Sequence, residues 1–144
     1  MKRKVMLVMI IGSLFLFSYS FAQTTDEESI RNVLYSQEKA WNTGNIEDFM
    51  KAYWKSDSLT YIGKSGVTYG WQKTLGTYKK NYPDTIAMGK LTYNLIELKS
   101  LSQGFYFVIG QWHLQRTTNN AGGYFTLLFK KIKNKWFIIA DHSS

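Results

Sequence analysis

The sequence has 144 residues, which suits one domain of ordinary size and leaves little room for a second. Lysine and arginine number 18 against 10 acidic residues, so the formal net charge is +8. Cysteine is absent, which excludes disulfides and cysteine-ligated metal sites, and stability must therefore come from core packing.

The first 22 residues have the pattern of a secretory signal peptide. A basic start at positions 2–4 precedes an apolar run over positions 5–17, and the small residues Ser20 and Ala22 predict cleavage between Ala22 and Gln23. The alternative is an uncleaved membrane anchor. The apolar run of 13 residues is short of the roughly 20 that span a bilayer, which favours cleavage.

Cleavage would leave residues 23–144 as a single periplasmic or secreted domain. Loss of the basic start leaves 15 basic and 10 acidic residues, a net charge of +5. Because this excess is modest and export is expected, we predict no nucleic-acid partner, and no membrane contact after cleavage.

Two helices are expected at the start of this domain. Apolar residues follow a 3.6-residue spacing that ends near Gly44, and Asn45 can cap a second, short helix. The buried faces expected are Ile30, Val33, Leu34, Gln37 and Trp41 on the first helix and Ile46, Phe49, Met50, Tyr53 and Trp54 on the second.

The rest of the chain is mostly strand-like. Residues 59–62 and 67–69 flank a four-residue loop with glycine at both ends, which predicts a hairpin, and Trp71, Leu75 and Tyr78 fit one further helix. Four longer strands are expected over 91–98, 105–116, 124–132 and 136–141. Short turns force antiparallel neighbours, so the fold class is α+β, with helices on one face of an antiparallel sheet.

Strand periodicity selects candidate ligand-binding residues on the second long strand. One face carries Tyr106, Val108, Gly110, Trp112, Leu114 and Arg116, and we expect it to be the concave face. Glycine there would let the sheet bend, and Arg116 at the rim could hold an anionic group. The alternative is that Trp112 only fills the core. The ligand-binding candidates are Trp41, Tyr53, Trp112, Arg116 and Tyr124.

The last strand ends in Asp141-His142, the titratable pair nearest the C-terminal end of the sequence. In a regular strand Ile138, Ala140 and His142 share one face, so we expect His142 to point inward and Asp141 outward. The catalytic candidates are therefore His142, Asp141 and, as a hydroxyl partner, Tyr61. His113 and the Asp141-His142 pair lack metal-ligand spacing, so we predict neither a metal nor a cofactor.

The order of these elements resembles the nuclear-transport-factor-2-like, or ketosteroid-isomerase-like, superfamily, and within it the small exported bacterial domains of the SnoaL-like family of unknown function. The residues that carry the resemblance are Trp41, Gly44, Phe49, Gly63, Gly66, Gly70, Gly110, Trp112, Gly122, Gly123 and the segment from Trp136 to Ser144. The resemblance spans residues 23–144. It implies a cone-shaped, strongly curved antiparallel sheet, with the N-terminal helices packed on its concave face and often a homodimer through the outer face.

The resemblance does not carry over an active site. The steroid isomerases use a tyrosine on the first helix and a carboxylate base near the first hairpin. Those positions hold Gln37 and Tyr61-Ile62-Gly63 here.

Two functions of different class remain. The first is a binding module whose cone-shaped pocket takes a small hydrophobic or weakly anionic molecule, or engages a partner chain. The second is a metal-free enzyme of isomerase, dehydratase or lyase type, with His142 as general acid or base and Tyr61 or Arg116 as electrophilic aid.

Overall fold

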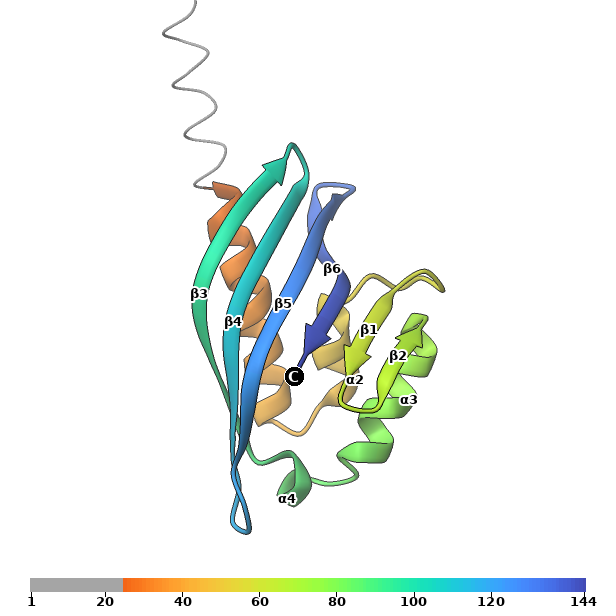
Figure 1. Ribbon diagram of the computed structural model, residues 1–144, viewed down its shortest axis with the longest axis vertical. Helices are drawn as coiled ribbons and strands as arrows, with labels where there is room; N and C mark the ends of the chain where they lie inside the picture. Colours follow the sequence, from red (N-terminus) through yellow and green to blue (C-terminus); the bar gives the residue numbers. More distant parts are fainter. Residues whose placement is uncertain (1–24) are drawn as a thin grey trace, which may run out of the picture.

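The computed structural model describes residues 25–144 as helices packed against one curved, open six-stranded sheet (Figure 1). The expected signal peptide and its cleavage site lie outside the described residues. In the part that is described, no helix is long and apolar enough to cross a membrane.

The N-terminal helix is helical from 25 through 42 and buries the face that its spacing predicts. The buried residues along it are Ile30, Leu34, Gln37 and Trp41.

Two polar side chains of this helix form hydrogen bonds with the backbone of strand β3 (Lys90–Ser102), which lies at the edge of the sheet. Asn42 exchanges two hydrogen bonds with the Leu91 backbone, at 2.7 and 2.9 Å, and the Glu38 carboxylate accepts from the Tyr93 N–H at 2.8 Å. The helix therefore covers both the apolar face and the edge of this strand.

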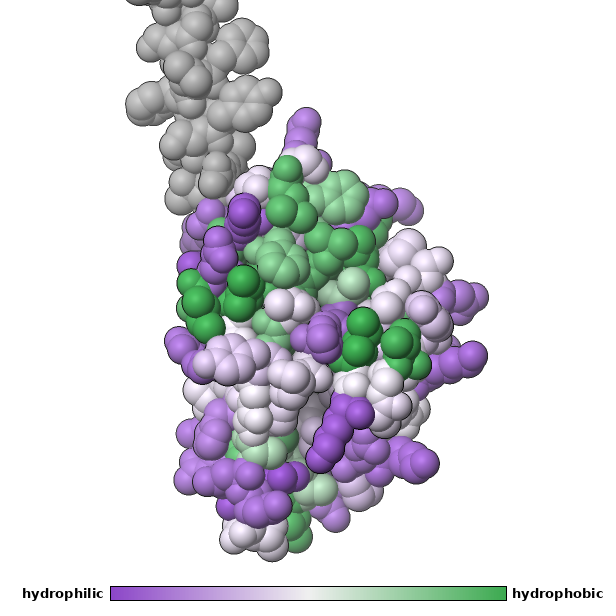
Figure 2. All heavy atoms as spheres, viewed as in Figure 1, coloured by the Kyte–Doolittle hydropathy of each residue, from purple (hydrophilic) through white to green (hydrophobic). Residues whose placement is uncertain are grey.

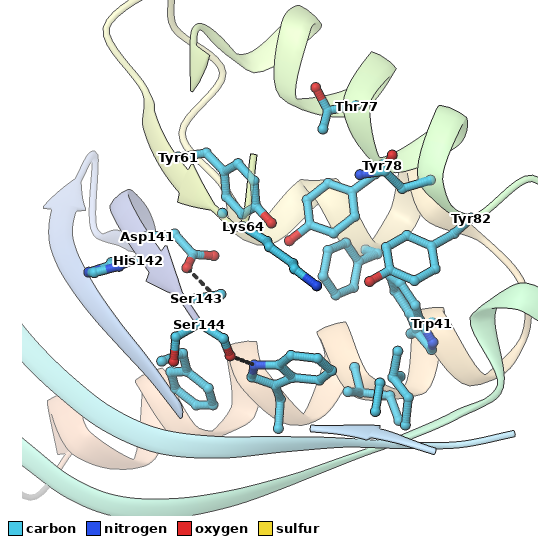
Figure 3. Close-up of a pocket in the computed structure, with 18 of the residues that line it drawn as sticks. Trp41, Tyr61, Lys64, Thr77, Tyr78, Tyr82, Asp141, His142, Ser143 and Ser144 are labelled. Carbon is cyan, nitrogen blue, oxygen red and sulfur yellow. Dashed lines mark hydrogen bonds between the residues drawn. The ribbon is translucent and has the colours of Figure 1, made fainter. Parts of the chain in front are cut away.

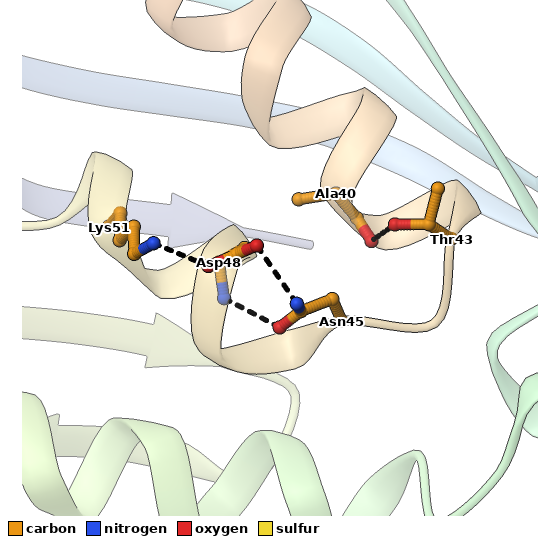
Figure 4. Close-up of polar contacts among 5 residues, drawn as sticks. All are labelled: Ala40, Thr43, Asn45, Asp48 and Lys51. Atoms are coloured by element: carbon orange, nitrogen blue, oxygen red, sulfur yellow. Dashed lines mark hydrogen bonds and ion pairs between the residues drawn. The ribbon is translucent and has the colours of Figure 1, made fainter.

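The second helix is short and is capped as predicted. It comprises α2 (Ile46–Phe49) and a 3-10 turn, η1 (Met50–Ala52). The Asn45 side chain accepts a hydrogen bond from the Asp48 N–H at 2.9 Å, and Lys51 pairs with the Asp48 carboxylate at 2.6 Å (Figure 4).

The hairpin and the third helix follow in the predicted order. Strands β1 (Thr60–Gly63) and β2 (Gly66–Tyr69) pair antiparallel, and α3 (Trp71–Asn81) comes next. A fourth helix, α4 (Thr85–Met88), was not predicted, because its four residues are too few for a periodic pattern. The Asp84 side chain caps it by accepting from the Ala87 N–H at 2.8 Å.

The four long strands form the predicted antiparallel sheet. They are β3, β4 (Phe105–Gln115), β5 (Ala121–Ile132) and β6 (Lys135–Ser143), and the sheet order is β2-β1-β6-β5-β4-β3. One junction differs from the prediction, since β1 pairs with β6 in parallel. A parallel pair is allowed there because three long strands intervene in the chain between β1 and β6.

The inner face of β4 is the one that the alternation predicts. Tyr106, Val108 and Leu114 are fully buried on it. Gly110 lies opposite Phe125 of β5, and a methyl group added at Gly110 would overlap the Phe125 ring. Glycine at this position therefore makes room for a ring on the concave face.

We predict that Gly110→Ala lowers the free energy of unfolding by about 1–3 kcal/mol, because the Phe125 ring must move out of a packed position. Gly76→Ala is the matched control: Gly76 lies within α3, and an added methyl group meets nothing within 4 Å. We expect the control to raise stability by about 0.5–1 kcal/mol. Urea unfolding of both variants measures the difference, and equal effects would contradict this account of Gly110.

Candidate functional site

A cavity of about 1060 Å³ lies between the concave face of the sheet and the helices (Figure 3). Nine aromatic side chains contribute to its wall, and they come from the helices and from the sheet. They are Trp41, Phe49, Tyr53, Tyr61, Tyr78, Tyr82, Tyr93, Trp112 and Phe125. Several rings contact one another edge to face, such as Trp41 with Tyr82 at 4.8 Å between centroids and Phe49 with Tyr78 at 5.1 Å. The wall is therefore aromatic and well packed.

A bulge in β6 determines which polar group faces this cavity. Leu128 pairs with Ala140, but Phe129 pairs with Ile138, so Ile139 is an additional residue on the β6 side. The alternation that buries Trp136 and Ile138 is shifted by one residue beyond this point. As a result Asp141 is buried, with 4% of its surface exposed, and His142 is exposed.

The Asp141 carboxylate lies at the cavity wall and accepts two hydroxyl hydrogen bonds. Tyr53 donates to Oδ2 at 2.6 Å, and Ser143 donates to Oδ1 at 2.7 Å. Burial raises the pKa of Asp141 to about 6, while the two hydroxyl donors and the nearby His142 oppose this rise. The carboxyl group therefore changes charge near pH 6.

Tyrosines extend this polar network into the cavity. The Tyr53 and Tyr78 hydroxyls lie 3.2 Å apart, and the Tyr93 hydroxyl donates to the Gln37 side chain at 3.2 Å. Burial raises the pKa of Tyr53, Tyr78 and Tyr93 well above the ordinary tyrosine value, and the negative charge of Asp141 is the next cause. The same two causes raise the pKa of Tyr61 to about 12. These hydroxyls are therefore neutral hydrogen-bonding groups at physiological pH.

Six of the eight sequence-selected residues border this cavity, and they are Trp41, Tyr53, Tyr61, Trp112, Asp141 and His142. Trp41 is fixed by an indole N–H bond to the Met88 carbonyl at 3.2 Å, and Trp112 by a similar bond to the Ser144 carbonyl at 3.2 Å. Their contact with a ligand stays a prediction.

The expected inward orientation of His142 is wrong. Its residue borders the cavity, but the imidazole is on the exposed side of β6 and points away in Figure 3. The expectation assumed a regular strand, and the bulge at Ile139 exchanges the faces of Asp141 and His142.

Arg116 and Tyr124, in contrast to the other six residues, are not part of the cavity wall. The Arg116 guanidinium donates to the Asn119 carbonyl at 2.8 Å and to the Ala87 carbonyl at 3.4 Å, so it holds the turn after β4 against α4. Tyr124 is 57% exposed because the buried residues of β5 are Phe125, Leu127 and Phe129, which places Tyr124 on the opposite face.

Sequence reasoning missed Tyr82, Tyr93 and Phe125 as cavity residues. For Tyr93 and Phe125 a signal was present: each alternates with apolar residues, Leu91 and Leu95 in one strand and Leu127 in the other. No periodic pattern identifies Tyr82, which follows the last residue of α3. Within residues 25–144, no group of three potential metal ligands is close enough to hold an ion.

We predict that Asp141 makes the protein less stable as pH rises. Its pKa is raised from 3.8 to about 6, so the folded state binds the proton more tightly than the unfolded chain does. Its unfavourable contribution is absent below about pH 4, grows between about pH 4 and 6, and reaches about 3 kcal/mol above pH 6.

Asp141→Asn is the matched control, because the amide retains the shape of the protonated acid and does not titrate. Urea unfolding of both proteins from pH 4 to pH 8 should show the wild type losing stability relative to the variant. Parallel stability curves would show that burial does not raise the pKa of this group.

Solved structures resemble this fold closely. An NTF-2 like protein of unknown function from Shewanella oneidensis MR-1 is 40% identical, with a TM-score of 0.79 over 83% of this chain and 98% of its own. A domain of unknown function with a cystatin-like fold from Nostoc punctiforme has 16% identity and a TM-score of 0.71 over 84% of this chain and 77% of its own. An NTF2-like superfamily protein from Salmonella enterica has 16% identity and a TM-score of 0.65 over 85% of this chain and 92% of its own.

No protein-family model and no curated protein matches the sequence. The two structures at 16% identity show the fold alone. The Shewanella protein, at 40% identity over nearly its whole length, shows the family as well. The chain belongs to the NTF2-like family.

Proposed function

We propose that this protein binds a small, largely apolar molecule in the aromatic cavity. The observation that supports the proposal is the cavity itself, about 1060 Å³ in volume with nine aromatic side chains in its wall. Protein interiors are otherwise close-packed, and cavities of roughly 300–1,000 Å³ with a few polar groups are typical of small-molecule sites. The earlier expectation of a weakly anionic ligand depended on Arg116, which bonds to backbone carbonyls instead.

Acid–base catalysis is the second candidate, with Asp141 in the place that the sequence suggested for His142. The supporting observation is a carboxyl group with a pKa of about 6 beside the Tyr53 hydroxyl, facing an apolar cavity. A group that titrates near working pH can take and return a proton in one turnover. Loss of turnover in Asp141→Asn with retained ligand binding would favour catalysis over binding alone.

We further propose export by the signal peptide at 1–22 and a homodimer through the outer sheet face. The support for export is the residue pattern of that segment. The support for the dimer is the apolar surface in Figure 2, since Ile96, Leu101 and Tyr124 of the long strands are exposed.

Native mass spectrometry of the protein purified from its own host tests the proposals of ligand binding and dimerisation. We expect a non-covalent small molecule that leaves on activation, and the mass of the assembly reports whether two copies associate. A ligand-free monomer would contradict both binding and dimerisation.

Filling the cavity should expel that molecule. Ala121 contributes to the wall at the start of β5, so Ala121→Phe places an aromatic ring in the cavity, whereas Ala121→Ser adds almost no volume. We expect the phenylalanine variant to bind at least tenfold more weakly and the serine variant to bind as the wild type does. If Ala121→Phe retains the small molecule as well as the wild type does, the ligand is bound elsewhere.

A further inference from the structure

The cavity has an unequal distribution of charge. Three of its wall residues other than tyrosines are ionisable: Lys64, Asp141 and His142. Lys64 lies on the β1–β2 turn and His142 on the open side of β6, and both are exposed, whereas Asp141 is buried. The buried part of the wall therefore carries one formal charge, which is negative above about pH 6.

The Asp141 carboxylate has capacity for a further partner. A carboxylate offers about four acceptor positions, and the Tyr53 and Ser143 hydroxyls occupy two of them. Within residues 25–144 the three ion pairs join other residues, and none includes Asp141. A buried carboxylate is costly without a counter-charge, so a cation entering the cavity would be stabilised there.

The aromatic wall favours the same kind of ligand. Ring faces carry partial negative charge and attract an ammonium group within about 6 Å. Trp41, Tyr78 and Tyr82 lie around the middle of the cavity in Figure 3, and Trp41 and Tyr82 are in direct ring contact. Burial raises the pKa of Tyr78 and Tyr82, so both are neutral, and the Lys64 side chain reaches toward them from the β1–β2 turn in Figure 3.

From these observations we propose that the ligand is a small organic cation, an amine or quaternary ammonium group on an apolar body. This inference depends on the proposed binding function and names its ligand class. The ammonium group would contact Asp141 and the aromatic faces, and the apolar body would extend along the wall toward Trp112 and Phe125.

The test compares three probes of similar size by isothermal titration calorimetry at pH 8. Benzyltrimethylammonium is the cation, neopentylbenzene its neutral carbon isostere, and phenylacetate an anion. We expect the cation to bind at least about tenfold more tightly than the isostere, a preference consistent with cation–π contacts and one desolvated carboxylate.

The outcomes separate this inference from the proposed function. Equal binding of the cation and its isostere would leave a small-molecule site intact and overturn the charge preference. Tighter binding of phenylacetate would overturn it as well. If none of the probes binds, the organic-cation proposal fails, whereas the proposed binding function fails only if native mass spectrometry also shows no retained small molecule.

Two variants test whether Asp141 is the residue that causes the preference for the cation over its neutral isostere. In Asp141→Asn the advantage of the cation over the isostere should fall about tenfold, while isostere binding changes less than twofold. Lys64→Ala removes the ammonium group that extends into the cavity in Figure 3, and should leave cation binding equal or tighter. Weaker cation binding in Lys64→Ala would contradict the assignment.

The pH dependence gives an independent measurement, because a quaternary ammonium does not titrate. Groups that face Asp141 are Tyr53, Tyr61, Tyr78 and Tyr93, whose pKa values lie well above neutrality, together with the exposed His142 and Lys64. Affinity for the cation should therefore fall as pH decreases through about 6, where Asp141 takes up its proton, and should be flat for the isostere. A flat profile for the cation would overturn the role of Asp141.

Discussion

One additional residue in strand β6 determines which chemical group faces the cavity. The bulge at Ile139 lets Trp136 and Ile138 pack into the core and then places Asp141 on the same buried side. Without it, the period of two would direct His142 inward and expose the carboxylate. The parallel pairing of β1 with β6 at Tyr61 and Asp141 then brings the first tyrosine of the hairpin beside this carboxylate.

The buried carboxylate is unfavourable for folding and useful for binding. Its removal from water raises its pKa, and the hydroxyls of Tyr53 and Ser143 only partly replace the lost solvation. A core selected for stability alone would place an apolar residue there. Polar groups that conflict with local rules tend to occur at functional sites, which supports Asp141 as the centre of this site.

Much of the fold could be predicted from the sequence because its elements are strongly periodic. The helical stripe from Ile30 to Trp41 and the alternation along β4 from Tyr106 to Leu114 both match the buried residues. The parallel β1–β6 pair could not be predicted, because strand pairing across a long connection leaves no local pattern. The same holds for α4, whose cap and four residues have no periodicity.

The site was predicted only in part, for reasons that depend on single residues. Trp41, Tyr53 and Trp112 belong to periodic faces, so their inward position follows from spacing. Asp141 and His142 exchanged places because a bulge depends on the register with β5, which the β6 sequence does not contain. The Arg116 side chain is held by one carbonyl of the turn after β4 and one of α4, and such contacts are set by the conformation of the connecting segments rather than by alternation.

Asp141, rather than His142, is the buried titratable group of the cavity. A carbon-13 NMR titration of the side-chain carboxyl groups tests it directly, with Asp141 assigned from the spectrum of Asp141→Asn. We expect a midpoint near pH 6 for Asp141, together with matching shifts of the Tyr53 ring signals. A midpoint near the ordinary value of 3.8, with unchanged tyrosine signals, would place the carboxylate in water and contradict the account.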